Sequence, residues 1–420
     1  MTRELGLSFA RFARLRGPDL TARCDGYARW AHTLAGADAW PYQRVLHSAP
    51  GREAVFENVS GRLRRGVNFT CQDYLSLSAH PAVASAAEEA LRAWGPHSAA
   101  SEPLGGRTAP SRELGRRLAA HLRTGADVAL FPTGWAAGYG AVAALLTDRD
   151  HVVLDEYAHA CLREGAASRT RNVRYFRHLD GAHLCEVLAA VRKRDARNGI
   201  LVVTESLFSM DGDAPSLRPL RAAADQFEAA LLVDIAHDYG AVGPQGLGQL
   251  GLQDVVGEID LLVGAFSKTF ATNGGFVATR REAVGEYVRC FASSSRASNA
   301  PSPIQIATAL ACFEVVVSDE GEQLRARLRR NVDALRGLLE VGGITCFGGY
   351  APFVLFPATS LEAGRQVAST LFDRGVFVGL VEFPAVPIRS PRFRLQVMAD
   401  HTPEDIVRAG TAIRDLLDRT

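Results

Sequence analysis

The segment ALLVDIAH at residues 230–237 is a short run of Leu and Val that ends in an acid and a histidine. Runs of this length, rich in Val, Ile and Leu and closed by polar residues, are typical of buried strands in a parallel sheet. Four other segments have the same form: VALF near residue 128, HVVLDE at 151, GILVVTES at 199 and DLLVGAFS at 260. Their spacing leaves room for a helix between successive strands.

The stretches between these runs carry the period of amphipathic helices. SRELGRRLAAHL and LRPLRAAADQFEAA repeat apolar residues every three or four positions. Strands and helices that alternate in this way predict an α/β fold with a doubly wound, mostly parallel sheet.

We expect three parts along the chain. Residues 1–60 mix aromatic and charged residues and are interpreted as an N-terminal helical arm. Residues 61–295 hold the alternating runs and are expected to form a large α/β domain. Residues 296–420 begin with a long helical stretch, continue with short strands around Phe353–Phe356 and Phe393–Val397, and end in a helix. This last part predicts a smaller C-terminal α+β domain.

The composition argues against several classes of partner. The chain has 420 residues and a formal net charge of +1, so no charge excess favours nucleic acid or an anionic membrane. No segment approaches the roughly 18 uninterrupted apolar residues of a spanning helix, and the first residues lack the apolar run of a signal peptide. The seven cysteines are scattered without a C-x-x-C pair, which favours neither disulfides nor zinc. We therefore expect a cytoplasmic protein without a bound metal.

Polar residues directly follow several of the expected strands. In doubly wound sheets, ligands bind at the carboxyl ends of the strands, so these residues are the candidates for a site. They are Thr133, Gly134, Trp135, His159, Glu205, Ser209, Asp234, His237, Ser267 and Lys268.

Lys268 follows the run LLVGAFS. A lysine at the buried end of a strand loses hydration, which favours the neutral and nucleophilic amine. Such an amine condenses with an aldehyde. A lone lysine in a loop more often extends into solvent, so the inference depends on the neighbours of Lys268.

Asp234 ends the run ALLVD. A carboxylate there can face a pyridinium nitrogen and keep the ring protonated, which makes the ring an electron sink. A cap for the following helix is an equally good interpretation of Asp234 taken alone. His237, three residues on, can donate to a ring hydroxylate or serve as a buried structural histidine.

Thr133, Gly134 and Trp135 open an apolar helix, and His159 follows another strand. Backbone N–H groups at a helix N-terminus favour a phosphate, although Gly and Thr begin many helices. The imidazole of His159 can stack on a ligand ring, but taken alone it is better interpreted as a packed histidine.

Seven segments, taken in order, resemble the α-oxoamine synthase family of fold-type I pyridoxal phosphate (PLP) enzymes. The resemblance runs from about Asn68 to the C-terminus. The segments are DYLSLSAHP at 73, PTGWAAGYG at 132, DEYAHACLREGA at 155, TESLFSMDGDAPSLRPL at 204, LLVDIAHDYGAVGPQGLG at 231, FSKTFATNGGFV at 266 and RFRLQVMADHTPEDI at 392. The family condenses an amino acid with an acyl thioester, and its site usually lies between two subunits.

The resemblance implies roles for the residues that would meet the cofactor ring. Lys268 would hold PLP as a Schiff base and act as general base and acid. Asp234 would pair with the pyridine nitrogen, His237 would contact the ring hydroxyl, and His159 would stack on the ring.

The resemblance also implies contacts around the ring. The backbone of Gly134 and Trp135, next to Thr133, would help hold the phosphate. Glu205 and Ser209 would line the pocket. Arg394 would bind the carboxylate of the amino acid with its planar fork.

The chain departs from the family pattern at four positions near the site. Ile235 stands where a second acid is usual, and Ala265 stands where a phosphate-contacting threonine is common, so either Ser267 or Thr272 is expected to compensate. Gln72 replaces an asparagine near the substrate, and Glu102 occupies a place often filled by arginine.

The sequence therefore predicts an enzyme that uses PLP to condense a small amino acid with an acyl thioester, carried on CoA or on an acyl-carrier protein, into an α-amino ketone. We expect a homodimer by resemblance. Two other hypotheses remain open: a different fold-type I reaction, such as transamination or a lyase reaction, and a non-catalytic PLP-binding partner subunit. The presence of Lys268 argues against the second.

Overall fold

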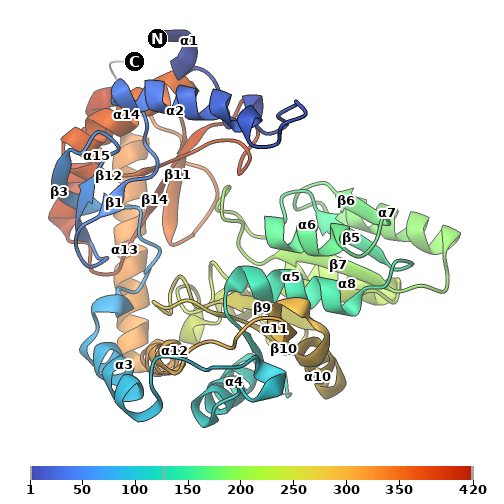
Figure 1. Ribbon diagram of the computed structural model, residues 1–420. Coiled ribbons are helices and arrows are strands. Elements are labelled where there is room, and N and C mark those ends of the chain that lie inside the picture. The colour runs from blue at the N-terminus through green and yellow to red at the C-terminus, as the bar shows by residue number, and fades with distance from the viewer. Residues whose placement is uncertain (1, 126–127, 418–420) are drawn as a thin grey trace. The chain divides into compact units, whose positions relative to one another are not determined.

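The structure is a computed structural model that describes residues 2–125 and 128–417 (Figure 1). Its contacts divide the chain into two compact units. The large unit comprises residues 77–209 and 213–325, and the small unit comprises residues 1–76, 210–212 and 326–420. Each unit is described separately below. The small unit joins both ends of the chain because strands from both ends pair in one sheet. The domain boundaries expected at residues 60 and 295 stay predictions.

A seven-stranded sheet forms the centre of the large unit, and the five runs singled out in the sequence are all strands of it. The strand order is β4-β10-β9-β8-β7-β5-β6, and only β10 runs antiparallel to its neighbours. The mostly parallel α/β sheet is therefore confirmed. The strands are β4 (Ala129–Phe131), β5 (His151–Asp155), β6 (Val173–Phe176), β7 (Ile200–Glu205), β8 (Ala230–Asp234), β9 (Leu261–Ala265) and β10 (Gly275–Thr279).

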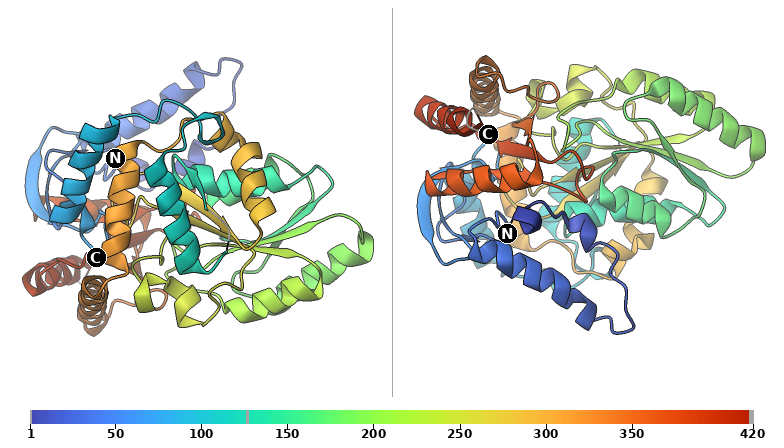
Figure 2. Two further views of the ribbon diagram at one scale, coloured as in Figure 1. Left: turned by 90° about the horizontal axis from the view of Figure 1, so that it is seen from below. Right: turned by 90° about the horizontal axis from the view of Figure 1, so that it is seen from above.

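Helices cover both faces of this sheet (Figure 2). On one face, apolar residues of α5, α6 and α10 share a buried cluster with residues of β4, β5, β7, β8, β9 and β10. The helices are α3 (Pro81–Trp94), α4 (Ala109–Leu122), α5 (Gly134–Leu145), α6 (Ala160–Ala167), α7 (Gly181–Arg194), α8 (Leu217–Gln226), α9 (Gly248–Leu252), α10 (Glu282–Phe291), α11 (Ser293–Arg296) and α12 (Pro303–Val316), with 3₁₀ turns at Leu77–Ala79, Glu102–Leu104 and Pro244–Gly246.

Helix α5 begins in close contact with the end of β9. A Cβ on Gly134 would collide with the Cβ of Ala265, the last residue of β9. A Cβ on Gly275 would likewise fall 2.6 Å from the Cα of Gly134. The small residues at these positions therefore allow the N-terminus of α5 to lie directly against the strand ends.

The small unit contains two sheets that combine both ends of the chain. The first has the order β1-β2-β3-β12, and the second has the order β11-β14-β13. The strands are β1 (Val45–Leu46), β2 (Glu53–Glu57), β3 (Leu63–Asn68), β11 (Phe353–Pro357), β12 (Val376–Phe377), β13 (Gly379–Val381) and β14 (Arg392–Gln396). The strands expected around Phe353–Phe356 and Phe393–Val397 are confirmed, whereas β1 and β2 lie in the part interpreted as purely helical.

The helices of the small unit lie near both ends of the chain. The long helical stretch expected after residue 300 forms two helices separated at Val317 and Ser318: α12 belongs to the large unit, and α13 begins there and continues into the small unit from residue 326. The helices are α1 (Thr2–Leu5), α2 (Asp25–Gly36), α13 (Asp319–Val341), α14 (Leu361–Asp373) and α15 (Pro403–Leu417), with 3₁₀ turns at Phe9–Arg11 and Ala22–Cys24.

An ion pair lies in the core of the small unit beside a cluster of aromatic rings. The side chain of Arg365 is fully buried, donates to the carboxylate of Glu382 at 2.7 Å and lies over the ring of Trp30. It also donates to the backbone carbonyl of Leu7 at 2.8 Å. Tyr42 donates its hydroxyl to the same carboxylate at 2.6 Å. These contacts tie the N-terminal residues to α14 and β13.

We expect the substitution Arg365→Met to lower the free energy of unfolding by about 3–5 kcal/mol, because it leaves the Glu382 carboxylate buried without its cation. Urea denaturation followed by circular dichroism measures this change. The double variant Arg365→Met/Glu382→Gln removes both charges and should recover part of the loss. A loss below about 1 kcal/mol, typical of exposed pairs, would contradict this account.

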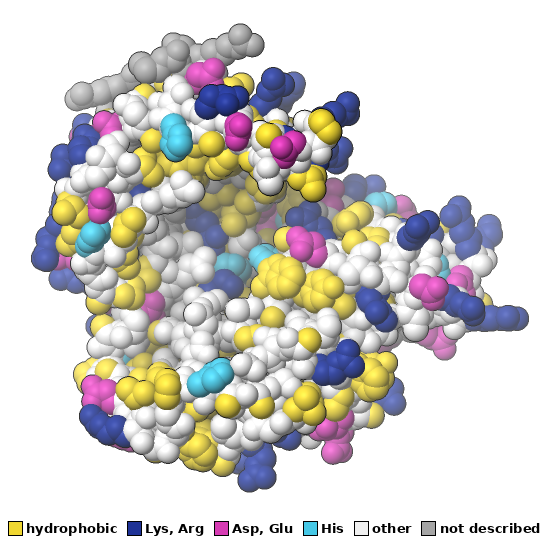
Figure 3. Space-filling view, viewed as in Figure 1, with side chains coloured by type: hydrophobic (Ala, Val, Ile, Leu, Met, Phe, Trp, Pro, Cys, Tyr) yellow, Lys and Arg dark blue, Asp and Glu magenta, His cyan; other side chains and the backbone are white. Residues whose placement is uncertain are grey.

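Charged side chains of both signs are interspersed on the face drawn in Figure 3. Within residues 2–125 and 128–417, none of the helices combines the length and the apolar character that a membrane crossing requires.

Candidate active site

Two carboxylates lie side by side at the ends of neighbouring strands. Glu205 ends β7, Asp234 ends β8, and the two residues are register partners. Both are buried, with exposed fractions of 4% and 8%. Burial raises the pKa of the Glu205 carboxyl, and the negative charge of Asp234 raises it further. The backbone N–H of His159 and the cation of Lys268 act in the opposite direction.

Lys268 and His159 belong to the same cluster of charges. Lys268 lies three residues beyond the end of β9 and is half-buried. His159 follows β5, and partial loss of hydration lowers its pKa, although Asp234 opposes this change and Lys268 supports it. The structure thus brings together four of the predicted residues, Glu205, Asp234, His159 and Lys268, at the carboxyl ends of β5, β7, β8 and β9.

The N-terminus of α5 lies at the same edge of the sheet, against the end of β9. Thr133 is the N-cap of α5, and its hydroxyl accepts a hydrogen bond from the backbone N–H of Ala136 at 3.0 Å. Trp135 is 46% exposed and stacks on Tyr139. Ser267 is exposed two residues after Ala265. A helix N-terminus at this edge of the sheet suits an anionic group.

His237 and Ser209 lie close in sequence to the carboxylate pair. His237 is buried, three residues after Asp234. Ser209 is half-buried, four residues after Glu205. Their contacts with a ligand stay predictions.

Arg394 and Gln72 belong to the small unit. Arg394 is buried on β14, its guanidinium lies 4.7 Å from the centre of the Phe353 ring, and it donates to the hydroxyl of Tyr74. Gln72 is half-buried, two residues before Tyr74. The part of these residues in substrate binding stays a prediction.

Three of the four departures from the family pattern have simple packing explanations. Ile235 is 1% exposed in the core. Ala265 leaves room for the close approach of Gly134 described above. Glu102 is buried and accepts a hydrogen bond from Arg289 at 2.9 Å, so its carboxylate serves an ion pair between the 3₁₀ turn and α10.

Sequence reasoning missed a second acid next to Asp234. Asp238 is fully buried and accepts hydrogen bonds from the Ser206 hydroxyl and from the Gln249 backbone N–H, both at 2.7 Å. Burial raises the pKa of Asp238 to about 7. The sequence does contain this acid: Asp238 directly follows His237, three residues after Ile235, the position where the family pattern has its second acid.

Sequence reasoning also missed a charged histidine at this edge of the sheet. His178 hydrogen-bonds to Asp155 at 2.9 Å and to Asp213 at 3.2 Å. Burial opposes its protonation, but the two carboxylates outweigh this effect and raise the pKa of His178 to about 10. Asp155 also accepts from the backbone N–H of Tyr157 at 2.9 Å. The two hydrogen bonds of Asp155, to His178 and to Tyr157, fix the loop that leads to His159.

We expect His178→Gln to lower the urea midpoint most strongly near pH 6. The pKa of the folded state, about 10, lies above the ordinary value of 6.5, so the imidazolium stabilises the fold fully below pH 6.5. This contribution is lost as the pH rises toward 10. The difference in urea midpoint between wild type and variant should therefore shrink from pH 6 to pH 10. The exposed histidine variant His32→Gln is the control, and a difference that grows with pH would refute the assignment.

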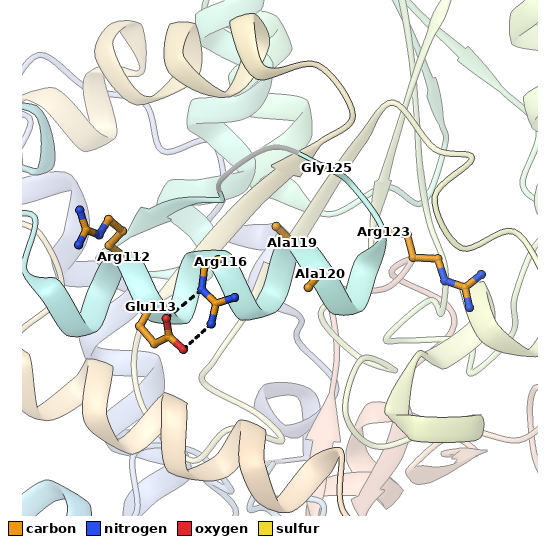
Figure 4. Close-up of a pocket in the computed structure, with 7 residues that line it drawn as sticks. All are labelled: Arg112, Glu113, Arg116, Ala119, Ala120, Arg123 and Gly125. Atoms are coloured by element: carbon orange, nitrogen blue, oxygen red, sulfur yellow. Dashed lines mark hydrogen bonds and ion pairs between the residues drawn. The ribbon is translucent and has the colours of Figure 1, made fainter.

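A hollow of about 820 Å³ lies along α4 (Figure 4). Its described lining consists of Arg112, Glu113, Arg116, Ala119, Ala120, Arg123 and Gly125, and Arg116 is paired with Glu113. None of the predicted site residues lines it. Within the described residues, no group of three or more His, Cys, Asp or Glu is arranged to hold a metal ion.

The model of a protein family described as aminotransferase class I and II matches residues 64–413. The chain belongs to this family. The chain is similar to 8-amino-7-oxononanoate synthase of Trichlorobacter lovleyi. The two sequences are 34% identical over 83% of this chain and 88% of that protein. Serine palmitoyltransferase of Bacteriovorax stolpii is 33% identical over 90% of this chain and 87% of that protein.

Solved structures agree with these matches. A lysine-to-alanine variant of serine palmitoyltransferase from S. paucimobilis, with a bound PLP–myriocin aldimine, has a TM-score of 0.89 at 26% identity and covers 96% of this chain and 99% of that one. The resemblance of this family member to α-oxoamine synthases and its fold-type I architecture are thereby confirmed.

The residues at the strand ends fit PLP. The amine of Lys268 suits the aldehyde, and the buried acid of Asp234 suits a ring nitrogen that carries a proton. The N-terminus of α5 suits a phosphate. The imidazole of His159 is exposed in the described structure, so one side chain beside these groups is accessible to a flat ring.

Proposed function

We propose that this chain joins an amino acid to an acyl thioester, with loss of carbon dioxide and release of the thiol, to give an α-amino ketone. The chain is an enzyme, and its cofactor is PLP. The single observation that carries the proposal is the cluster of Glu205, Asp234, His159 and Lys268, which combines an amine with a buried acid at adjoining strand ends.

Each residue of the cluster has a defined task in this proposal. Lys268 would hold the cofactor covalently and, as a free amine, would take the proton from the α-carbon of the amino acid. Asp234 would keep a proton on the ring nitrogen, and His237 would donate to the ring oxygen. When bound, PLP supplies an electron sink that stabilises negative charge on the α-carbon.

The remaining residues orient the substrates and exclude water. His159 would pack against the ring face, and Glu205 and Ser209 would close the pocket around it. Thr133, Gly134, Trp135 and Ser267 would receive the phosphate. Arg394 fixes the carboxylate of the amino acid with two parallel hydrogen bonds, and Gln72 lies near the same substrate.

The bond changes balance without a further reactant. The nucleophilic α-carbon attacks the thioester carbonyl, a carbon–carbon bond forms as the carbon–sulfur bond breaks, and the sulfur leaves as a thiolate that takes a proton from water. The carboxylate then leaves as carbon dioxide, and a proton returned by Lys268 completes the α-amino ketone. We place this reaction in the cytoplasm and expect a homodimer, which light scattering of the purified protein tests.

The deciding experiment measures thiol release from acyl-CoA and from acyl-carrier protein in the presence of glycine, alanine or serine. At least one combination should release thiol and carbon dioxide in equal amounts. An enzyme that converts amino acids to keto acids but releases no thiol with any combination is an aminotransferase, and this result would overturn the proposal.

A further inference from the structure

The side chain of His159 has a partner that the proposed function does not use. The ring nitrogen Nδ1 of His159 lies 3.0 Å from the Sγ of Cys161. The same nitrogen accepts a hydrogen bond from the backbone N–H of Cys161 at 3.3 Å, because His159 is the N-cap of α6. One nitrogen atom therefore faces both the thiol and the first turn of the helix.

The backbone N–H decides which atom carries the proton. An N–H group can only donate, so Nδ1 must offer its lone pair to it. A proton on Nδ1 would point at this donor and lose the cap. The thiol must then be the donor in its own contact with Nδ1, and the proton of the neutral ring must be on Nε2.

The thiol of Cys161 is suited to remain a donor. It is 1% exposed, and burial together with the carboxylates of Asp234 and Glu205 raises its pKa well above the usual range. It is therefore a protonated S–H group and not a thiolate.

The position of the thiol is fixed from the opposite side by α5. A Cβ on Gly138 would fall 2.5 Å from the Sγ of Cys161 and 3.4 Å from a methyl carbon of Leu162. The thiol thus occupies a place that only a glycine at residue 138 leaves open. The backbone N–H of His159 also interacts with the carboxylate of Glu205, whose pKa it lowers.

We propose that Cys161 is a positioning residue that donates to the neutral Nε2–H tautomer of His159 and sets the orientation of its ring. The consequence for the site, which rests on the proposed function, is that His159 presents a fixed ring face and an N–H donor to its ligand. It does not accept a proton at Nδ1. His159 is then not a general base. Among these residues, Lys268 is the group that takes the proton from the α-carbon.

The tautomer can be measured on the wild-type protein without PLP. Histidine labelled with ¹⁵N in both ring nitrogens distinguishes protonated from unprotonated nitrogens by NMR, and the spectrum of His159→Gln identifies the signal. We expect an unprotonated Nδ1 and a protonated Nε2. A proton on Nδ1 of His159 in the wild type would overturn the inference, and this measurement needs no variant at residue 161.

Three variants test the role of the thiol. Cys161→Ala removes the donor, Cys161→Ser keeps a donor, and Cys312→Ala removes a buried thiol of α12 outside the cluster. The readout is the dissociation constant of PLP from the apoprotein, measured by fluorescence titration. We expect Cys161→Ala to raise it about five-fold, the size of one lost hydrogen bond. Cys161→Ser should stay within about two-fold, and Cys312→Ala should leave it unchanged.

The NMR spectra of Cys161→Ala and Cys161→Ser should both keep an unprotonated Nδ1 on His159, because the backbone N–H of residue 161 remains, so the loss of the thiol should appear in PLP binding through the orientation of the ring. Equal weakening of PLP binding by Cys161→Ala and Cys161→Ser would overturn the inference, because it would assign the effect to packing. These measurements need no thioester. If no thiol is released but His159 has the expected tautomer, only the proposed function is rejected. If thiol is released but Nδ1 of His159 carries a proton, only this inference is rejected.

Discussion

Replacing Lys268 with alanine is expected to abolish the absorbance band of lysine-bound PLP and to lower the turnover by about 10³-fold or more. The residue has two tasks in the proposed reaction, covalent attachment of the cofactor and transfer of the α-proton. Loss of general acid–base catalysis alone typically removes about 10²–10⁴-fold of the rate. The fold should remain, because Lys268 is only half-buried.

The chain provides a matched control for this experiment. It contains two lysines, Lys193 and Lys268, and Lys193 is exposed at the end of α7. Lys193→Ala should keep both the absorbance band and the turnover. A Lys268→Ala protein that retained the band would contradict the assignment.

Borohydride reduction gives a second, independent readout of the attachment. Reduced cofactor on Lys268 blocks tryptic cleavage there, so mass spectrometry should find one modified peptide that spans residues 222–280. Unmodified protein should instead give peptides 222–268 and 269–280. Modification found on Lys193 and absent from Lys268 would contradict the proposal.

The parts of the fold with strong local signals were predictable from the sequence. The runs that became β5, β7, β8 and β9 are continuous and apolar because these strands are buried on both faces. The strands β1 and β2 escaped prediction because they are short and partly exposed. Their stability depends on pairing with β3, whose other neighbour β12 lies some 300 residues further along the chain.

The candidate site could be predicted in outline for a similar reason. Residues that follow buried strands are visible in a sequence, and the sheet topology gathers them at one edge. Cys161 and His178 carry no such signal. Cys161 has its role through a glycine of α5, and His178 has its charge through carboxylates that follow two other strands. Such contacts depend on the packed structure and not on local pattern.

We expect Asp234→Asn to lower the turnover by about 10²–10³-fold without lowering the stability of the fold. The activity should fall because an amide cannot hold a proton on the ring nitrogen, and the loss of one preorganised electrostatic partner typically has this size. The stability should not fall, because burial and the neighbouring Asp234 charge both raise the pKa of Glu205. Removing one of two adjacent buried carboxylates relieves that repulsion.

Two further variants separate this effect from a general loss of acid groups. Asp254 is exposed, so Asp254→Asn should change neither property. Asp238 is fully buried against Ser206 and Gln249, where it supports the chain behind Asp234. Asp238→Asn should therefore affect the urea midpoint more than the turnover, the reverse of Asp234→Asn. If Asp234→Asn lost stability and kept its turnover, Asp234 would be a structural acid. It would then not keep the cofactor ring protonated, and the proposed reaction would lack the electron sink that it requires.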